Sequence, residues 1–452
     1  MLWKIFLVAL AVRWTYAILM FALLGDASLQ TVDSTTYVAN AHDFAAQIAS
    51  GSLSGLQWLG PTGNTMPLFQ WLTGLCALAF GAAMPLGYVL LQGIFDTCTC
   101  LLVYGIARAM DDAYAAPAGI AAAFNPTQIV MSGLVLTDPP FLLFTALFLY
   151  ASVRWLRTPA WYWAVLTGLA LGAATLTRVL AAPFAAVLLL FLLVVCLVRK
   201  QLSRNLIAQL VGAAVIFTLC LAPIIWRNVS QYGAWSLTPQ SGKHLALWVA
   251  PLVREAVDGT PWARGYDEMQ HRVDERYPTP AADPFEQSRR YESVAREELS
   301  ALGIRAMVKA WLTGAAINLG SPAIILSPPV SELPRTGFYG THGSSPLDKV
   351  QNFLFHSDNA TYAWILLAGI AGVMAARLVQ LVGIAVVWRH GGLLPVLCLF
   401  GLWIAYVIAI DGPVASPKYR LPVEPPLMVL AGAGLSVMFR RFLNHEHHSK
   451  PA

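Results

Sequence analysis

The chain has 452 residues, of which 57% are hydrophobic and only 12% are charged, whereas soluble domains carry about 25% charged residues. Its mean hydropathy of +0.60 excludes an ordinary soluble protein and predicts a protein embedded in lipid. The net charge of +5 is explained by basic cytoplasmic loops, so it does not indicate a nucleic-acid partner. All six cysteines lie in apolar segments, where they behave as small hydrophobic residues and predict neither a disulfide nor a zinc site.

Apolar segments long enough to cross a bilayer as helices recur along the whole chain, since a span needs about 17 to 25 residues. We therefore predict an all-α polytopic membrane protein, a single integral membrane domain over residues 1–452, with about ten transmembrane helices. The predicted spans cover residues 2–25, 86–108, 113–131, 139–157, 160–179, 182–198, 206–226, 361–388, 391–411 and 421–439.

Basic residues mark the cytoplasmic ends of these spans. The residues are Arg108, Arg154, Arg157, Arg199, Lys200, Arg204, Arg389, His390, Arg440 and Arg441. Alternation then places both termini in the cytoplasm, with a tail over 440–452, and puts the two long polar loops, 26–85 and 227–360, outside. Two apolar stretches inside these loops are predicted not to cross: Pro67–Gly81 as a re-entrant or surface helix, and 305–326 as an interfacial helix.

Two acids stand at outside corners of the predicted bundle. Asp33 lies in the first outside loop with Tyr37 four residues later, so the two side chains share one helix face. Asp138 stands at the next outside corner, before Pro139 and Pro140. Helix capping explains either acid equally well. Together, however, two carboxylates at one membrane face are suited to divide the roles of general base and positioning group.

Four basic residues, Arg178, Arg227, Lys418 and Arg420, are predicted at the same membrane level. Snorkelling to the interface explains each one alone, but several that converge would form a site for phosphate or pyrophosphate. Inside the spans, we expect Arg13 and Asp96 to pair, because isolated charges in lipid are costly.

Taken in order, these motifs resemble the C-type glycosyltransferase superfamily (GT-C), in the branch of the protein O-mannosyltransferases and the lipid A aminoarabinose transferase. The residues that carry the resemblance are Asp33 with Tyr37, Met66-Pro67-Leu68, Asp138, Leu176-Thr177-Arg178, Ala222-Pro223, Trp226-Arg227-Asn228, Tyr232-Gly233, Tyr419-Arg420-Leu421-Pro422 and Glu424-Pro425.

The resemblance implies a GT-C-like helical bundle with interfacial helices in extracytoplasmic loops. It also implies an inverting glycosyltransferase that takes a sugar from a polyprenyl-phosphate donor and moves it to a glycan, lipid or protein acceptor. By the same resemblance Asp33 is the base, Asp138 orients the acceptor or sugar, and Tyr37 assists. The four basic residues are the candidates to hold the lipid phosphate.

The expected location is the plasma (inner) membrane, with the site facing the periplasm or exterior. No cofactor is required for this chemistry, with a divalent cation left open, and no metal-ligand motif is seen. Two alternatives remain: another enzyme of lipid-linked glycans, of the O-antigen ligase or polymerase type, and a secondary transporter with Arg13, Asp96 and Arg377 along its pathway. The absence of internal repeats in the sequence argues against the transporter.

Overall fold

The computed structural model describes residues 1–63, 65–334, 346–356 and 358–448, and within these residues the regular structure is helical, without strands. The predicted all-α class is confirmed. Part of the cytoplasmic tail predicted over 440–452 lies outside the described residues. The α-helices are α1 (Leu2–Leu24), α2 (Val32–Ala49), α3 (Pro67–Phe80), α4 (Met84–Met110), α5 (Asp112–Ala123), α6 (Pro126–Ser132), α7 (Asp138–Arg157), α8 (Trp161–Thr177), α9 (Ala182–Val198), α10 (Arg204–Tyr232), α11 (Gln240–His244), α12 (Ala250–Asp258), α13 (Trp262–Arg276), α14 (Pro284–Gly320), α15 (Pro328–Ser331), α16 (Pro346–Phe355), α17 (Ala360–Arg389), α18 (Leu394–Asp411) and α19 (Glu424–His448).

Short helical turns join several of these helices. They are η1 (Asp26–Leu29), η2 (Gly55–Leu59), η3 (Gly81–Ala83), η4 (Val179–Ala181), the π-helical η5 (Leu245–Val249), η6 (Ala323–Leu326), η8 (Gly391–Leu393) and η9 (Pro417–Val423).

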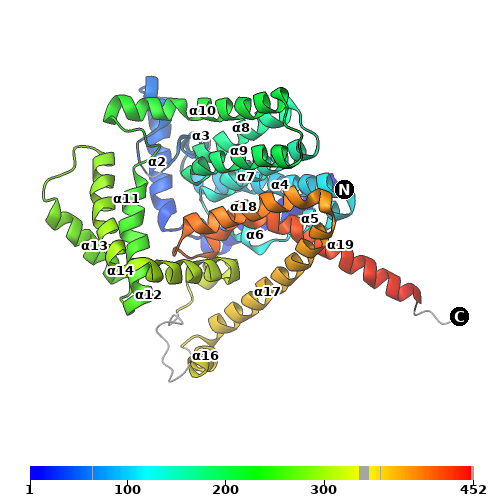
Figure 1. Ribbon diagram of the computed structural model, residues 1–452. Helices are drawn as coiled ribbons and strands as arrows, with labels where there is room; N and C mark the ends of the chain where they lie inside the picture. Colours follow the sequence, from blue (N-terminus) through cyan, green and yellow to red (C-terminus); the bar gives the residue numbers. More distant parts are fainter. Residues whose placement is uncertain (64, 335–345, 357, 449–452) are drawn as a thin grey trace.

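The long apolar helices form a bundle, and the polar segments lie across one of its ends. In Figure 1, α4, α7, α8, α9, α10 and α18 run roughly parallel, whereas α2 and α11 to α13 are set across them at the left. The starts of α7 and α19 and the ends of α8 and α18 point to that same end. The N-terminus lies at the other end, which is also the direction in which α19 runs.

Eight helical stretches of the described chain are long and apolar enough to cross a membrane. They are 2–24, 67–110, 138–157, 179–198, 204–232, 360–389, 391–411 and 417–439. A multi-pass membrane protein is therefore confirmed, but the count of about ten is not. The predicted span over 160–179 is a shorter helix, Trp161–Thr177.

The predicted span over 113–131 is divided into α5 and α6. The break lies at Asn125 and Pro126, where Pro126 has no N–H to continue the α5 hydrogen-bond ladder. The Asn125 side chain instead caps α6 by accepting from the Thr127 N–H at 2.8 Å. Hydropathy alone does not detect such a break, because both short helices are apolar.

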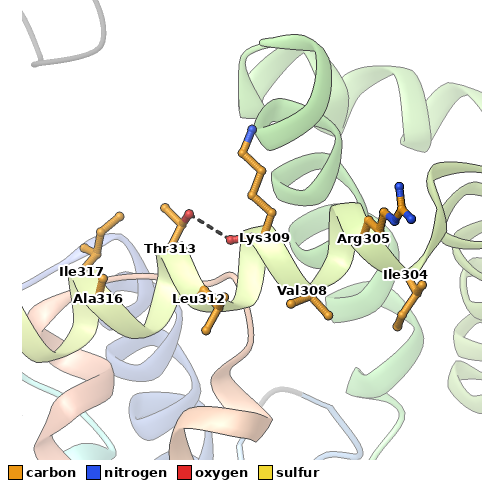
Figure 2. Close-up of a pocket in the computed structure, with 8 residues that line it drawn as sticks. All are labelled: Ile304, Arg305, Val308, Lys309, Leu312, Thr313, Ala316 and Ile317. Atoms are coloured by element: carbon orange, nitrogen blue, oxygen red, sulfur yellow. Dashed lines mark hydrogen bonds between the residues drawn. The ribbon is translucent and has the colours of Figure 1, made fainter. Parts of the chain in front are cut away.

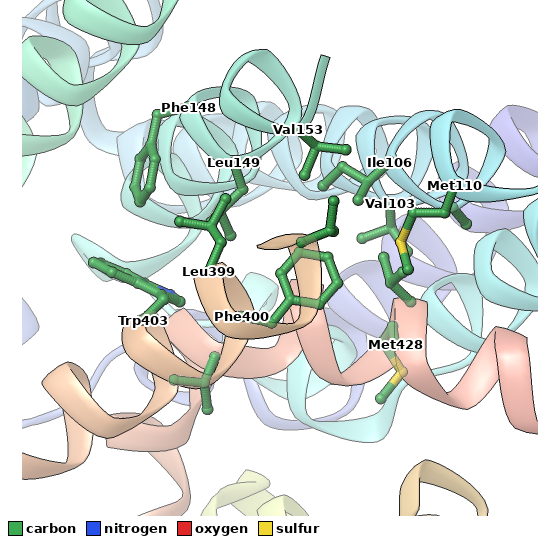
Figure 3. Packing of buried hydrophobic residues seen from close by; sticks show 14 of the residues in the cluster. Val103, Ile106, Met110, Phe148, Leu149, Val153, Leu399, Phe400, Trp403 and Met428 are labelled. Carbon is green, nitrogen blue, oxygen red and sulfur yellow. The ribbon is translucent and has the colours of Figure 1, made fainter. Parts of the chain in front are cut away.

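The core lies between the spans, where aliphatic and aromatic side chains of α4, α7, α18 and α19 meet (Figure 3). Trp403 of α18 is fully buried, and its ring lies edge-on to Phe148 of α7, with 5.1 Å between the ring centroids. The indole N–H donates to the Pro422 carbonyl at 2.8 Å. This contact joins the middle of the core to η9, which carries residues of the site described below.

The long helix α14 bends at Gly303, whose φ of 80° lies in the region that favours glycine. Beyond the bend, Ala306, Ala310 and other small residues are buried, whereas Ile304 and Leu312 are exposed. Figure 2 shows this exposed face, which borders an open groove of about 700 Å³ that also includes Arg305, Val308, Lys309, Thr313, Ala316 and Ile317. One apolar face beside basic residues is the composition of a helix at a lipid interface, as predicted for 305–326.

Candidate functional site

Asp33 lies in the first turn of α2 and is not its cap. The cap residue is Thr31, which forms a capping box with Ser34: the Ser34 hydroxyl accepts from the Thr31 N–H at 2.8 Å. The capping explanation for Asp33 is therefore wrong. Its carboxylate is left for other partners, and its side chain is 53% exposed.

That carboxylate pairs with a residue from the far end of the chain. The Lys418 ammonium of η9 donates to Asp33 Oδ2 at 2.8 Å, across 385 positions of sequence. An ammonium has three N–H donors, and Lys418 stays 19% exposed, so it has capacity to bind another anion. Within the described chain, no donor is within hydrogen-bond reach of Asp33 Oδ1.

Asp138 forms a second acid–base pair at the start of α7. Thr137 is the N-cap position of this helix, and Pro139 and Pro140 occupy its first turn. The buried Asp138 carboxylate accepts from Arg178 Nη1, and the Thr137 hydroxyl donates to it at 3.4 Å. Arg178 is 20% exposed whereas Asp138 is 1% exposed, so the guanidinium lies between the buried acid and the surface.

The two pairs lie within one electrostatic neighbourhood. The charges of Asp33 and Asp138 both act on Lys418, and both pairs act on Tyr37, whose ring packs edge-on to Phe69 at 5.0 Å between centroids. Burial raises the pKa of Tyr37 to about 12, with Lys418 opposing the shift and Asp33 adding to it. The phenol is thus neutral at ordinary pH and keeps its O–H donor. The fold thus brings together five predicted residues that are separated in sequence: Asp33, Tyr37, Asp138, Arg178 and Lys418.

Three further residues of this neighbourhood had no role predicted in the site. Asp411 ends α18, is 7% exposed and lies close enough to Arg178 and Asp138 for their charges to interact. Tyr419 neighbours the same groups. His244, at the end of α11, has its pKa lowered by burial and by the Arg178 charge. Asp411 had a sequence signal, because an acid closes an otherwise apolar span there, whereas His244 had none.

Arg227 and Arg420, also predicted for the phosphate, have other partners in the structure. The buried Arg420 donates to Glu424 at 2.6 Å, to the Thr127 hydroxyl at 2.7 Å and to the Ser321 carbonyl at 2.7 Å. Arg227 donates to the Gly60 carbonyl at 2.8 Å. The phosphate-binding roles of these two residues stay predictions.

The predicted ion pair between Arg13 and Asp96 is confirmed, at 2.5 Å between Nε and Oδ2. Its other partners come from four helices: Arg13 also donates to the carbonyls of Ala9, Ala122 and Ala123 and to the Cys100 sulfur, and Asp96 Oδ1 accepts from Gln128 at 2.9 Å. Both charged side chains are fully buried. This pair joins α1, α4 and the α5–α6 break.

Across the described residues, no three His, Cys, Asp or Glu side chains are grouped closely enough to hold a metal ion. The site is therefore characterised by its two acid–base pairs rather than by a ligand cluster.

Comparisons with known proteins agree with this architecture. A family model described as "Dolichyl-phosphate-mannose-protein mannosyltransferase" matches residues 63–226, which include Asp138 and Arg178 but not Asp33 or Lys418. No curated protein matches the chain.

Solved structures with a similar fold include the oligosaccharyltransferase AglB of Archaeoglobus fulgidus in complex with an inhibitory peptide and a dolichol-phosphate. It matches with a TM-score of 0.54, 14% identity and coverage of 100% of this chain and 52% of AglB. The apo form of the A. fulgidus oligosaccharyltransferase matches with a TM-score of 0.55 and 16% identity. The match covers 99% of this chain and 51% of the oligosaccharyltransferase. ArnT from Cupriavidus metallidurans bound to undecaprenyl phosphate matches with a TM-score of 0.40 and 16% identity. The match covers 96% of this chain and 77% of ArnT.

The family match over residues 63–226 confirms the resemblance to the GT-C superfamily. The oligosaccharyltransferase structures share the fold. The chain spans about half the length of the first two solved structures.

Proposed function

We propose that this protein is an inverting glycosyltransferase that moves a sugar from a polyprenyl-phosphate donor to an acceptor on the extracytoplasmic face of the plasma membrane. The observation that carries the proposal is the pair of carboxylates, Asp33 and Asp138, each bound to a cation with unused donors. The acceptor is a glycan, a lipid or a protein.

Asp33 is suited to be the general base. Its carboxylate is exposed, and its Oδ1 has no partner in the described chain, so this oxygen is available to an acceptor hydroxyl. As the acceptor oxygen attacks the anomeric carbon from the face opposite the phosphate, its proton passes to Asp33. The new C–O bond forms, the bond between the anomeric carbon and the phosphate oxygen breaks, and the configuration inverts.

Lys418 and Arg178 are suited to stabilise the leaving group. When the glycosyl bond breaks, the electron pair stays on the polyprenyl phosphate, which changes from a diester with one negative charge to a monoester with two. Cations fixed in place beforehand lower the energy of that developing charge. Lys418 has two N–H donors that do not contact Asp33, and only one Arg178 nitrogen is bound to Asp138.

Asp138 then has a positioning role. Its carboxylate is almost fully buried and bound to Arg178, so it orients the guanidinium toward the surface, where the phosphate would lie. Tyr37 and Asp411 border the same groups.

The comparisons support this choice of substrates. AglB is described with a dolichol-phosphate, and the phosphate of such a lipid meets water at the membrane surface. The gathering of basic residues at the opposite end of the bundle, including Arg108, Arg154 and Arg389, supports a site on the extracytoplasmic side and cytoplasmic termini.

The test is a transfer assay with the protein in nanodiscs, supplied with polyprenyl-phosphate sugars and a membrane extract as the source of acceptors. Release of polyprenyl phosphate by the wild type, and its loss in Asp33→Asn, is the expected result. Asp112→Asn is the matched control, because it breaks an exposed ion pair with Arg108 at 3.0 Å outside the site. Equal release by wild type and Asp33→Asn would contradict the mechanism.

A further inference from the structure

A polar cleft lies along α2, beyond the groups that the proposed reaction uses. Its volume is about 580 Å³, within the usual range of small-molecule sites. Six of its nine lining residues are polar. We call it the α2 cleft, after the helix that supplies Asn40, Asp43, Phe44 and Gln47; Gln57 of η2 and Gln70 of α3 face them.

The cleft is held open by buried contacts between its walls. Gln70 is buried, and its amide donates to the Asn40 carbonyl at 2.8 Å, which joins α3 to α2. Gly60 has a φ of 72°, and an added Cβ would lie 3.1 Å from Gln70 Cγ. Arg227 of α10 donates to the Gly60 carbonyl. The loop after η2 is thus fixed from two sides, and Arg227 acts here as a support for the cleft.

The cleft and the catalytic groups lie on one face of α2. At 100° per residue, Asp33, Tyr37, Asn40, Phe44 and Gln47 fall within a stripe about 80° wide. A rise of about 1.5 Å per residue puts Asn40 about 10 Å and Gln47 about 21 Å from Asp33 along the helix axis. The cleft therefore begins about 10 Å along the helix from the proposed base, and Tyr37, which packs on Phe69, lies between them.

The chemistry of the lining selects among acceptors. The side chains of Asn40, Asp43 and Gln47 have no hydrogen-bond partner within the part of the chain that the structure describes. Amides offer donors and acceptors side by side, and a carboxylate offers acceptors only, a combination that matches hydroxyl groups, which can do both. The lining contains one charged group, Asp43, so it disfavours an anionic acceptor. Phe44 is the one large apolar side chain among the lining residues.

We infer that the α2 cleft binds the acceptor, and that this acceptor is an uncharged oligosaccharide whose terminal hydroxyl points to Asp33. The inference rests on the proposed function for the role of the bound glycan, but binding in the cleft can be measured without transfer. A protein acceptor is the rival class, and the experiment includes it.

The experiment measures binding to the full-length protein in nanodiscs by saturation-transfer NMR. The probes are neutral gluco- and manno-oligosaccharides of two to four sugars and, separately, a threonine-containing peptide. Gln47→Ala removes one pair of hydrogen-bonding groups and Gln47→Trp fills the cleft; both changes are on an exposed helix surface, so folding is preserved. Gln201→Ala, outside the cleft on the loop before α10, is the matched control.

Wild-type binding of an oligosaccharide, weakened about fivefold to tenfold in Gln47→Ala and abolished in Gln47→Trp, supports the inference. Equal binding by all variants, or binding of the peptide alone, overturns it. Affinity for polyprenyl phosphate is measured on the same samples and should not differ among them. Failure of the wild type to bind polyprenyl phosphate would count against the proposed function. The oligosaccharide measurement tests separately whether the α2 cleft binds a glycan.

Discussion

Two arginine–aspartate pairs of this protein have the same chemistry but different surroundings. Arg13 makes five hydrogen bonds with its guanidinium, to Asp96, three carbonyls and the Cys100 sulfur, and a guanidinium has five donors. Arg178 makes one, to Asp138. Arg13 is fully buried, whereas Arg178 is 20% exposed.

The difference separates a structural pair from a functional one. A buried charge with all its donors bound has nothing left for a ligand, and removing its partner leaves an uncompensated charge. A partly exposed charge with free donors can bind an anion without breaking its own pair. By this criterion Lys418, like Arg178, is a functional charge. Arg420 is a structural charge like Arg13, because its donors contact Glu424, Thr127 and two carbonyls.

The largest expected effect is on catalysis. Asp33→Asn should lower transfer by about 10²- to 10⁴-fold, because the amide cannot accept the acceptor's proton. Its thermal stability should hardly change, since an exposed ion pair contributes little. The measurement is release of polyprenyl phosphate alongside a thermal unfolding curve. A stability loss that accounts for the lost activity would remove Asp33 from the mechanism.

The structural pair should respond in the opposite way. Asp96→Asn should lower the free energy of unfolding by about 3–5 kcal/mol, since it leaves Arg13 buried without a counter-charge. The turnover per folded molecule should stay close to wild type. Thermal unfolding in detergent and activity normalised to the folded fraction check both statements. A stable but inactive Asp96→Asn protein would place this pair in the reaction or on a transport pathway.

Arg420→Lys tests the comparison at a residue that the sequence assigned to the phosphate site and that has the buried contacts of a structural charge. Lysine cannot reproduce contacts to Glu424, Thr127 and two carbonyls, so we expect a destabilisation of about 1–3 kcal/mol with unchanged affinity for polyprenyl phosphate. The sequence alone predicts the reverse, a loss of donor affinity through the lost guanidinium fork. Binding and unfolding measured on the same samples decide between the two.

The smallest effect is expected for Tyr37→Phe, which should lower transfer by less than about tenfold, the cost of one hydrogen bond. Burial raises the pKa of Tyr37 to about 12, so the phenol stays protonated and the pH profile up to pH 10 should match wild type. Above pH 10 the unfolded tyrosine ionises first, so the wild type should lose stability toward pH 12 and Tyr37→Phe should lose less. A shift of the alkaline limb below pH 10 in the variant would contradict this.

Much of the site could be predicted because charged residues are rare in a chain that is 12% charged. Each acid or base beside an apolar segment is costly to place in lipid, so Asp33, Asp138, Arg178 and Lys418 stand out. The same reasoning predicted Arg13 with Asp96. The same reasoning assigned Arg227 and Arg420 to the phosphate site. The sequence shows that a basic residue lies near the membrane surface, but it does not show which of its N–H donors already have partners.

The sequence by itself determined the helical class and most of the spans, since hydropathy over about 20 residues is a local property. Tertiary structure decided where Asn125 breaks a predicted span, and it decided that Asp33 meets Lys418 across 385 positions. It also added Asp411 and His244 to the site and formed the α2 cleft from three separate segments. Such contacts depend on how the helices pack, and packing sets which donors remain free for a substrate.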